Sequence, residues 1–315
     1  MDIYLKNKEP VTLQTANKYC KEDININIET EQLNIKPSST QQIKEGLFDK
    51  VTVEATGEEN AVVVEVAPSG ATISKLIKKL PTLDFSAVTS MIGLFQNCIN
   101  LEEISIINAS QATTMQRTFY NSTKLQKVSV LGTTKLTTLL EAFYLCSALK
   151  TVEMPDTGLV SNFDSTFMSC TALEEAPSLN TANASTFNSM FYECTNLKTI
   201  PLLDASKVID VKSMFRVSSG SMQFENLGGF KNLGKAYTTK LSNAEAYALD
   251  LHYSTKLTHD SLMNVINNLY DLNLTYDVAN GGTLYTQKLI LGSTNMAKLT
   301  AEEIAIATNK GWNVS

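Results

Sequence analysis

Residues 190–201 read Met-Phe-Tyr-Glu-Cys-Thr-Asn-Leu-Lys-Thr-Ile-Pro, and variants of this string recur along the middle of the 315-residue chain. A Phe returns every 24 residues, at Phe95, Phe119, Phe143, Phe167, Phe191 and Phe215. Phe makes up only 12 of the 315 residues, so six in one column cannot arise by chance. A fixed period of this length indicates a solenoid, in which each unit buries its apolar face only against its neighbours.

Each repeat divides into two segments by the spacing of its apolar residues. Apolar residues stand seven and four residues before the column Phe, which places them with the Phe on one face of about two helical turns. The run that follows, such as Leu197, Ile200 and Leu202, suits a short strand with inward side chains six, nine and eleven residues after the Phe. We therefore predict an α/β solenoid of about six units of 24 residues.

Four of the five cysteines stand three residues after the column Phe: Cys98, Cys146, Cys170 and Cys194. Ser122 and Ser218 occupy the same column in the other two repeats. Cys and Ser are both small and both donate hydrogen bonds, so the column predicts a buried structural ladder against a loop backbone. Disulfides and zinc are not expected, because the number of cysteines is odd and the spacing matches no zinc-ligand pattern.

The two ends of the chain differ from the repeats, so we predict three domains with bounds 1–68, 71–236 and 237–315. Residues 24–28 alternate with period two, and residues 51–53 and 62–66 are β-branched runs. These patterns predict a small N-terminal β domain over 1–68 that serves as an attachment module. A Pro-Ser-Gly boundary at 68–70 then precedes the solenoid of residues 71–236.

Residues 237–315 are predicted to form a C-terminal cap, because a stacked array needs a terminal unit with a polar outer face. Thr258 is placed to cap one helix, and Thr300 with Glu303 forms a capping box that opens another, which Gly311 closes. Short strands are expected at 249–251 and 289–291. The Asn-Gly-Gly stretch at 280–282 predicts a hairpin insertion.

Charge and hydropathy exclude several classes of function. The net charge is −6 and no basic stripe is present, so a nucleic-acid partner is not expected. No apolar run approaches the roughly 18–20 residues that span a bilayer, so membrane insertion is not expected. The N-terminus has no hydrophobic segment of the signal-peptide type, so the chain is not expected to enter the secretory route by itself.

The sequence predicts no catalytic, cofactor-binding or metal site. His252 and His259 belong to no metal-binding or nucleophile motif, and the Gly-Gly pairs lack the Lys that follows in a phosphate-binding loop. The carboxylate pairs at 102–103, 174–175 and 302–303 invite comparison with glycosidases. However, the side chain seven residues after the Phe is acidic in some repeats and basic in others, which is typical of cross-strand pairing of opposite charges. The chain is therefore not expected to be an enzyme.

The strand positions that face outward, eight and ten residues after the Phe, are the predicted ligand face. This face is polar and mixed in charge, and it offers no aromatic side chain on which a sugar could stack. Its candidate residues are Glu103, Ser105, Lys127, Ser129, Thr151, Glu153, Glu175 and Thr199.

The Phe-x-x-Cys-x-x-Leu-x-x-Ile-Pro pattern of residues 191–201 resembles the BspA-like leucine-rich repeat, and the resemblance covers about residues 85–224. It implies a leucine-rich-repeat solenoid used for adhesion or display, without a reaction. Residues 13–26 and 35–53 resemble segments of tail and receptor-binding proteins from phages of Gram-positive bacteria. The stretch from Leu291 to Trp312 is similar to phage-borne repeat proteins.

These resemblances together favour a structural and recognition protein of a phage or prophage tail, located in the virion. Its expected partners are other tail proteins, or a protein or glycan of the host surface, and a homo-oligomer is left open. The alternative is a bacterial BspA-like adhesin or secreted interaction protein at the cell surface. Neither hypothesis involves a cofactor.

Overall fold

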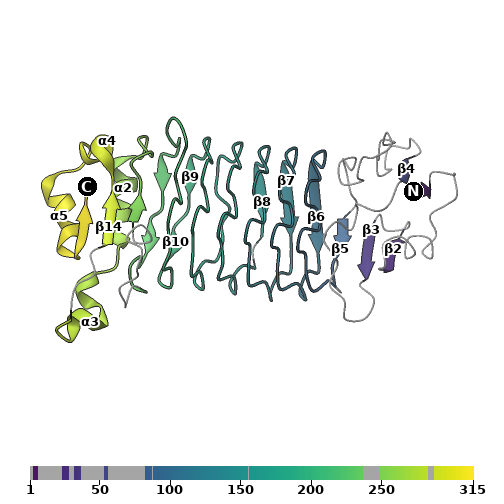
Figure 1. Ribbon diagram of the computed structural model, residues 1–315, viewed down its shortest axis with the longest axis horizontal. Helices are drawn as coiled ribbons and strands as arrows, with labels where there is room; N and C mark the ends of the chain where they lie inside the picture. The colour runs from purple at the N-terminus through teal and green to yellow at the C-terminus, as the bar shows by residue number, and fades with distance from the viewer. Residues whose placement is uncertain are drawn as a thin grey trace. The chain divides into compact units, whose positions relative to one another are not determined.

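The computed structural model describes residues 82–86, 88–154, 156–236, 248–282 and 287–315, together with four short strands nearer the N-terminus (Figure 1). Those strands are β1 (Ile3–Leu5), β2 (Asp23–Asn27), β3 (Gln32–Lys36) and β4 (Val53–Ala55). The chain forms two compact units, unit 1 (Met1–Leu159) and unit 2 (Val160–Ser315).

The main sheet of unit 1 has six strands in the order β2-β3-β5-β6-β7-β8. Its repeat strands are β5 (Thr82–Asp84), β6 (Glu103–Ile107), β7 (Lys127–Val130) and β8 (Thr151–Glu153). They pair in parallel with a register of one repeat, so Ile104, Val128 and Val152 lie side by side with buried side chains. The strand predicted after each Phe is therefore confirmed in these repeats.

The N-terminal strands extend this sheet. β2 runs antiparallel to β3, and β3 pairs in parallel with β5, while β1 and β4 form a separate antiparallel pair. β2 confirms the strand predicted from the alternation at 24–28. The β-branched run at 62–66, the boundary at 68–70 and Cys20 lie outside the described residues. The division into domains at 1–68, 71–236 and 237–315 thus stays a prediction.

The prediction of a helix around each column Phe was wrong. The described repeats contain no α-helix there. The segment instead forms consecutive turns with bonds between residues three apart, as from Thr118 N to Met115 O at 3.1 Å and from Cys146 N to Phe143 O at 3.0 Å. Apolar residues at helical spacing point the same way in such turns. The spacing alone therefore could not separate the two structures.

Residues with a left-handed backbone conformation on both sides of the Phe explain why no helix forms. Two residues before or after the Phe, φ is positive at Gly93, Asn97, Arg117, Asn121, Glu141, Leu145, Ser165, Ser169, Ser189, Glu193 and Ser213. Such a residue interrupts a right-handed helix and costs about 1–2 kcal/mol when it is not Gly. The freed N–H groups bond to the next coil instead, as from Phe95 N to Thr118 O at 2.8 Å.

The column of Phe side chains forms the centre of the core in each unit. In unit 1 the Phe119 ring stacks on the rings of Phe95 and Phe143, each with 5.4 Å between ring centroids. In unit 2 the Phe191 ring stacks on Phe167 at 5.6 Å and on Phe215 at 6.1 Å. All of these rings are buried, which confirms the predicted Phe ladder.

The Cys and Ser column is buried from Cys98 to Cys194, where its side chains bond to the backbone of the preceding coil, whereas Ser218 at its end is exposed. Cys146 Sγ donates to Phe119 O at 3.0 Å, and Ser122 Oγ donates to Phe95 O at 2.8 Å. In unit 2, Cys194 Sγ donates to Phe167 O at 2.9 Å. Within the described residues, Cys98, Cys146, Cys170 and Cys194 form no disulfide. The predicted ladder is confirmed.

These thiols are expected to be chemically inert in the folded protein. Burial raises the pKa of Cys146 and of Cys194 to about 12, so both stay protonated and lack the nucleophilic thiolate at mildly alkaline pH. Alkylation followed by peptide mass spectrometry should leave both unlabelled in buffer and fully labelled in guanidinium. Because folding raises these pKa values, the two protonated thiols contribute fully to the free energy of unfolding below the ordinary thiol pKa. This contribution falls as the pH rises above that value. Native labelling as fast as that of glutathione would contradict the buried ladder.

Unit 2 continues the coils with shorter strands. β9 (Thr199–Ile200) pairs in parallel with β11 (Asn226–Leu227), and β10 (Leu203–Asp204) pairs in parallel with β12 (Phe230–Lys231). Glu175 forms only an isolated bridge with Thr199. A Pro lies two residues after Glu175 and directly after Ile200, and it cannot donate a backbone bond to a ladder. This explains why the strands of these repeats are short.

The C-terminal part of unit 2 is a small α/β layer. A parallel sheet contains β13 (Ala248–Asp250), β14 (Gln287–Ile290) and β15 (Trp312–Val314) in that order. The helices are α2 (His259–Asn268), the 3-10 helix η3 (Leu272–Leu274), α3 (Tyr276–Ala279), α4 (Gly292–Met296) and α5 (Ala301–Asn309). The strands expected at 249–251 and 289–291 are confirmed as β13 and β14.

The predicted helix ends are confirmed, and the predicted hairpin is not. Thr258 accepts a bond from Ser261 N at the start of α2, and Thr300 forms a capping box with Glu303 at the start of α5. Gly311 follows α5 with a φ of 85°. The segment before Asn280 forms η3 and α3 instead of a strand, so the hairpin prediction was wrong on that side, and residues 283–286 lie outside the described residues.

Candidate functional site

The predicted ligand face lies on the exposed side of the strands in unit 1. Two rows run across β6, β7 and β8: Glu103, Lys127 and Thr151 in one, and Ser105, Ser129 and Glu153 in the other. The side chains of the first row are exposed, whereas Ser105 and Ser129 of the second row are half-buried, and a ligand-binding role of this face stays a prediction.

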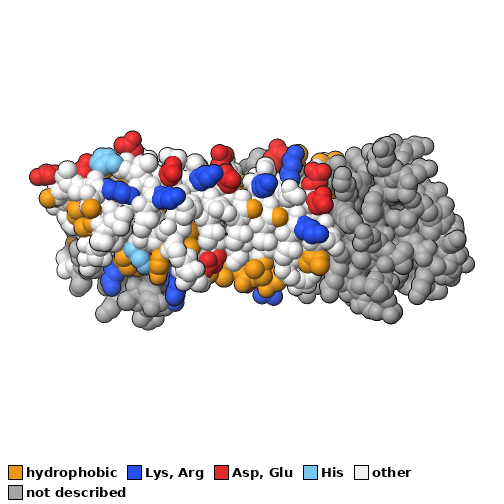
Figure 2. Space-filling model, turned by 90° about the horizontal axis from the view of Figure 1, so that it is seen from above, with side chains coloured by type: hydrophobic (Ala, Val, Ile, Leu, Met, Phe, Trp, Pro, Cys, Tyr) orange, Lys and Arg blue, Asp and Glu red, His pale blue; other side chains and the backbone are white. Residues whose placement is uncertain are grey.

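Polar side chains on this strand face lie beside polar side chains of the neighbouring strands. Lys127 lies in register between Glu103 and Thr151, and Ser129 Oγ donates to Glu153 Oε2 at 3.0 Å. Figure 2 shows acidic and basic side chains interspersed on the described part of the surface seen in that view, without a field of one sign. Such a face suits a solvated surface as well as a binding surface.

In unit 2 the predicted ligand residues Glu175 and Thr199 also lie beside each other. One residue before them, Lys198 Nζ contacts Glu174 Oε2 at 2.6 Å, and this hydrogen bond raises the pKa of Lys198. The carboxylate of Glu174 is thus held by the next repeat. Opposite charges on adjacent coils are confirmed here as cross-strand pairing, which is worth less than about 1 kcal/mol at an exposed position.

A second surface of unit 1, which the sequence argument missed, is formed by the turns around the Phe column. We define this turn face as Arg117, Tyr120, Glu141 and Tyr144. The rings of Tyr120 and Tyr144 lie 4.9 Å apart between centroids and are half-buried. The two rings thus pack against each other across two neighbouring coils, with part of each side chain exposed.

Arg117 and Glu141 support this aromatic pair. Arg117 Nε donates to Glu141 Oε2 at 2.5 Å, and the guanidinium carbon lies 5.8 Å from the centre of the Tyr120 ring. Arg and Tyr both combine apolar contact area with hydrogen-bond donors. The signal was present in the sequence, since the position after the column Phe is Tyr in three of the six repeats.

The histidines have structural partners. His259 Nε2 lies 2.8 Å from Glu303 Oε1 and His252 Nδ1 lies 2.5 Å from Asp250 Oδ1. The hydrogen bond with Glu303 raises the pKa of His259, while the backbone N–H of Thr300 is the main cause of the lowered pKa of Glu303. His259 therefore joins the first turn of α2 to the capping box of α5.

The described ranges contain neither a candidate metal cluster nor a candidate membrane-spanning helix. No group of three or more His, Cys, Asp or Glu side chains there could hold a metal ion. No helix among them has the length and apolar character needed to cross a membrane.

The repeats of this chain match a known sequence family. Residues 91–220 match the BspA type leucine rich repeat region in six copies. The resemblance to BspA-type repeats predicted from Phe, Cys and Leu is confirmed over this range. No curated protein matches the chain, and nothing supports the resemblance to phage tail or receptor-binding proteins.

Two solved structures are similar to the chain. The crystal structure of the leucine rich repeat protein of T. pallidum shares 16% identity with a TM-score of 0.32, and the match covers 68% of this chain and 87% of that one. A leucine-rich repeat protein from Bacteroides ovatus shares 14% identity with a TM-score of 0.26, and the match covers 86% of this chain and 70% of that one.

Proposed function

We propose that this chain is a non-enzymatic recognition protein that binds another protein through its BspA-type repeats, at the bacterial cell surface or after secretion. The six-copy match over residues 91–220 is the observation that carries the proposal. Stacked repeats of this kind present extended surfaces whose side chains vary while the core is kept. In this proposal the chain is a leucine-rich-repeat solenoid of about six repeats with a C-terminal cap.

The turn face is the better candidate for the binding surface. Tyr and Arg are enriched at the centres of protein interfaces, whereas Ser, Lys and Glu are depleted. The aromatic pair of Tyr120 and Tyr144 with the adjacent Arg117 has this composition. The strand face consists of the depleted residue types, and Ser129 is already bonded to Glu153.

Site-specific photocrosslinking in cells of the source organism tests the proposal. The photoreactive residue p-benzoylphenylalanine is introduced into the full chain at Tyr144 on the turn face and, as the matched control, at Lys127 on the strand face. We expect ultraviolet light to link the Tyr144 variant to one discrete protein and to leave the Lys127 variant unlinked. Adducts from Lys127 alone would show that the strand face binds, and adducts from neither would contradict protein recognition by unit 1.

The cellular location follows from a second experiment. Protease treatment of intact cells should remove the protein if it is displayed at the surface, and the culture medium should contain it if it is secreted. Retention inside protease-treated cells would contradict both locations. Recovery at several copies per tail from density-purified phage particles would instead support the virion hypothesis, which no match to a known protein supports.

The absence of catalysis is part of the proposal and has its own test. Purified full-length protein is incubated with cell-wall polysaccharide, and we expect no new reducing ends. Cleavage that is abolished by Glu→Gln changes at 102–103 or 174–175 would overturn the non-enzymatic assignment.

A further inference from the structure

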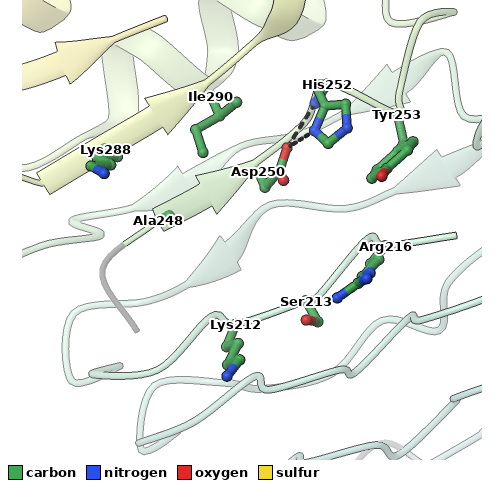
Figure 3. A pocket seen from close by; sticks show the side chains of 9 residues that line it. All are labelled: Lys212, Ser213, Arg216, Ala248, Asp250, His252, Tyr253, Lys288 and Ile290. Carbon is green, nitrogen blue, oxygen red and sulfur yellow. Dashed lines mark hydrogen bonds and ion pairs between the residues drawn. The ribbon is translucent and has the colours of Figure 1, made fainter. Parts of the chain in front are cut away.

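A pocket of about 320 Å³ lies in unit 2, where the last repeat meets the C-terminal sheet (Figure 3). Its volume falls at the lower end of the range of about 300–1,000 Å³ that is usual for ligand sites, so a group the size of one sugar ring is a suitable occupant. The lining contains three basic side chains, from Lys212, Arg216 and Lys288, and one acidic side chain, from Asp250. This excess of positive charge contrasts with the net charge of −6 of the whole chain.

The fold brings these groups together from three separate segments. Lys212 and Arg216 belong to the turns around the last column Phe, Phe215. Asp250 and Lys288 come from β13 and β14, which pair in parallel with Ala248 opposite Lys288. Because strand side chains alternate between faces, the four lining positions of these two strands, 248, 250, 288 and 290, share one face of the sheet.

The single carboxylate of the pocket is partly occupied by its own neighbour. Asp250 Oδ1 accepts from the backbone N–H of His252 at 3.0 Å and lies 2.5 Å from His252 Nδ1. The second carboxylate oxygen of Asp250 can accept bonds from ligand hydroxyl groups, while the lysines and the arginine attract an anion. The lining thus combines acceptors for hydroxyl groups with donors for a negative charge.

The aromatic side of the pocket is formed by Tyr253. Its ring lies 3.6 Å from the imidazole of His252 between centroids and is half-buried. An aromatic ring with a hydroxyl group offers an apolar face to the C–H groups of a sugar and a polar edge to its hydroxyls. A bare inorganic anion would use the cations of this pocket without using the ring.

We propose that this pocket binds an anionic monosaccharide unit, with its carboxylate or phosphate against Arg216 and its ring against Tyr253, which lies at the same end of the pocket in Figure 3. Uronic acids and sugar phosphates share this chemistry and are the two sources to be distinguished. The site uses none of the turn-face residues, so it goes beyond the protein partner proposed above and does not depend on it.

Isothermal titration of the full-length protein tests the assignment with glucuronic acid, glucose 6-phosphate, neutral glucose and inorganic phosphate as probes. We expect one or both of the anionic sugars to bind, and glucose and phosphate to bind at least about tenfold more weakly, because hydrogen bonds to charged groups are the strong ones. Binding of glucuronic acid alone identifies a carboxylate ligand, and binding of glucose 6-phosphate alone identifies a phosphate ligand. Equal binding of glucose, equal binding of inorganic phosphate, or no binding of either acid would overturn the proposal.

Variants of the pocket provide the second arm of the test. Arg216→Gln should weaken binding of the anionic sugar by about tenfold or more, and Tyr253→Ala should weaken binding of the sugar but not of inorganic phosphate. Lys256→Gln, at an exposed position outside the pocket lining, removes one positive charge as the matched control and should leave binding unchanged. Circular dichroism checks that each variant is folded. An equal loss of binding in the Lys256 variant would assign the effect to net charge and overturn the site.

Discussion

Leu173→Asp is expected to unfold the repeats of unit 2. Leu173 is fully buried, three residues after the buried Cys170 and within the stacked coils. A carboxylate at this position would have no cationic partner in the core, and burying an unpaired charge costs more than a single domain of about 5–15 kcal/mol net stability can readily absorb. Circular dichroism of the purified variant should show loss of the cooperative thermal transition of this unit.

Glu175→Ala is the matched control, because Glu175 lies two residues further along the same segment and is exposed. Its removal should change the free energy of unfolding by less than about 0.5 kcal/mol, which is usual for surface positions. Small effects of equal size from both changes would contradict the inward and outward register of this repeat.

Asn295→Ala should destabilise the C-terminal part of unit 2 by about 3 kcal/mol, because the two N–H donors and the carbonyl acceptor of this amide lose hydrogen bonds of about 1 kcal/mol each. Asn295 is fully buried, and its Nδ2 lies 3.1–3.2 Å from the carbonyl oxygens of Leu251, Ser254 and Leu291. Its Oδ1 accepts from Lys298 Nζ at 3.1 Å. One amide therefore joins the loop after β13 to the start of α4. Chemical denaturation with guanidinium measures the loss.

Asn313→Ala serves as the control for this change, since Asn313 is an exposed residue on β15 in the same layer. Its effect should stay within about 0.5 kcal/mol. If the two Ala variants unfolded at the same denaturant concentration, the buried amide would not be the connection between β13 and α4 that its hydrogen bonds indicate.

Sequence reasoning succeeded where the signal is local or periodic. The 24-residue spacing of Phe119 and its counterparts predicted the buried column, and Thr258 and Thr300 predicted the starts of α2 and α5. A capping side chain bonds to a backbone N–H two or three residues away, so its partner is written in the neighbouring sequence. The Cys and Ser column was predictable for a related reason, since only small donors fit a buried position facing a loop carbonyl.

The same reasoning failed at the turns. Positive φ at Arg117 and Glu193 belongs to residues that rarely adopt it, and their backbone N–H groups are held by hydrogen bonds to the next coil. These bonds join residues one repeat apart, so no window of sequence as long as a helix contains both partners. Helical spacing of the apolar residues was therefore compatible with two structures.

By itself, the sequence determined the repeat period and the inward columns, because each depends on one residue type that recurs at one spacing. It also determined the helix caps, because a capping side chain bonds to a backbone N–H of its own neighbourhood. Only the tertiary structure decided how the coils join by turns, that Tyr120 stacks against Tyr144, and that Lys288 shares a pocket with Arg216. The physical reason is that these contacts depend on which coils and strands become neighbours. Residues that are far apart along the chain, such as Arg216 and Lys288, line one pocket only once the parallel pairing of β13 with β14 has formed.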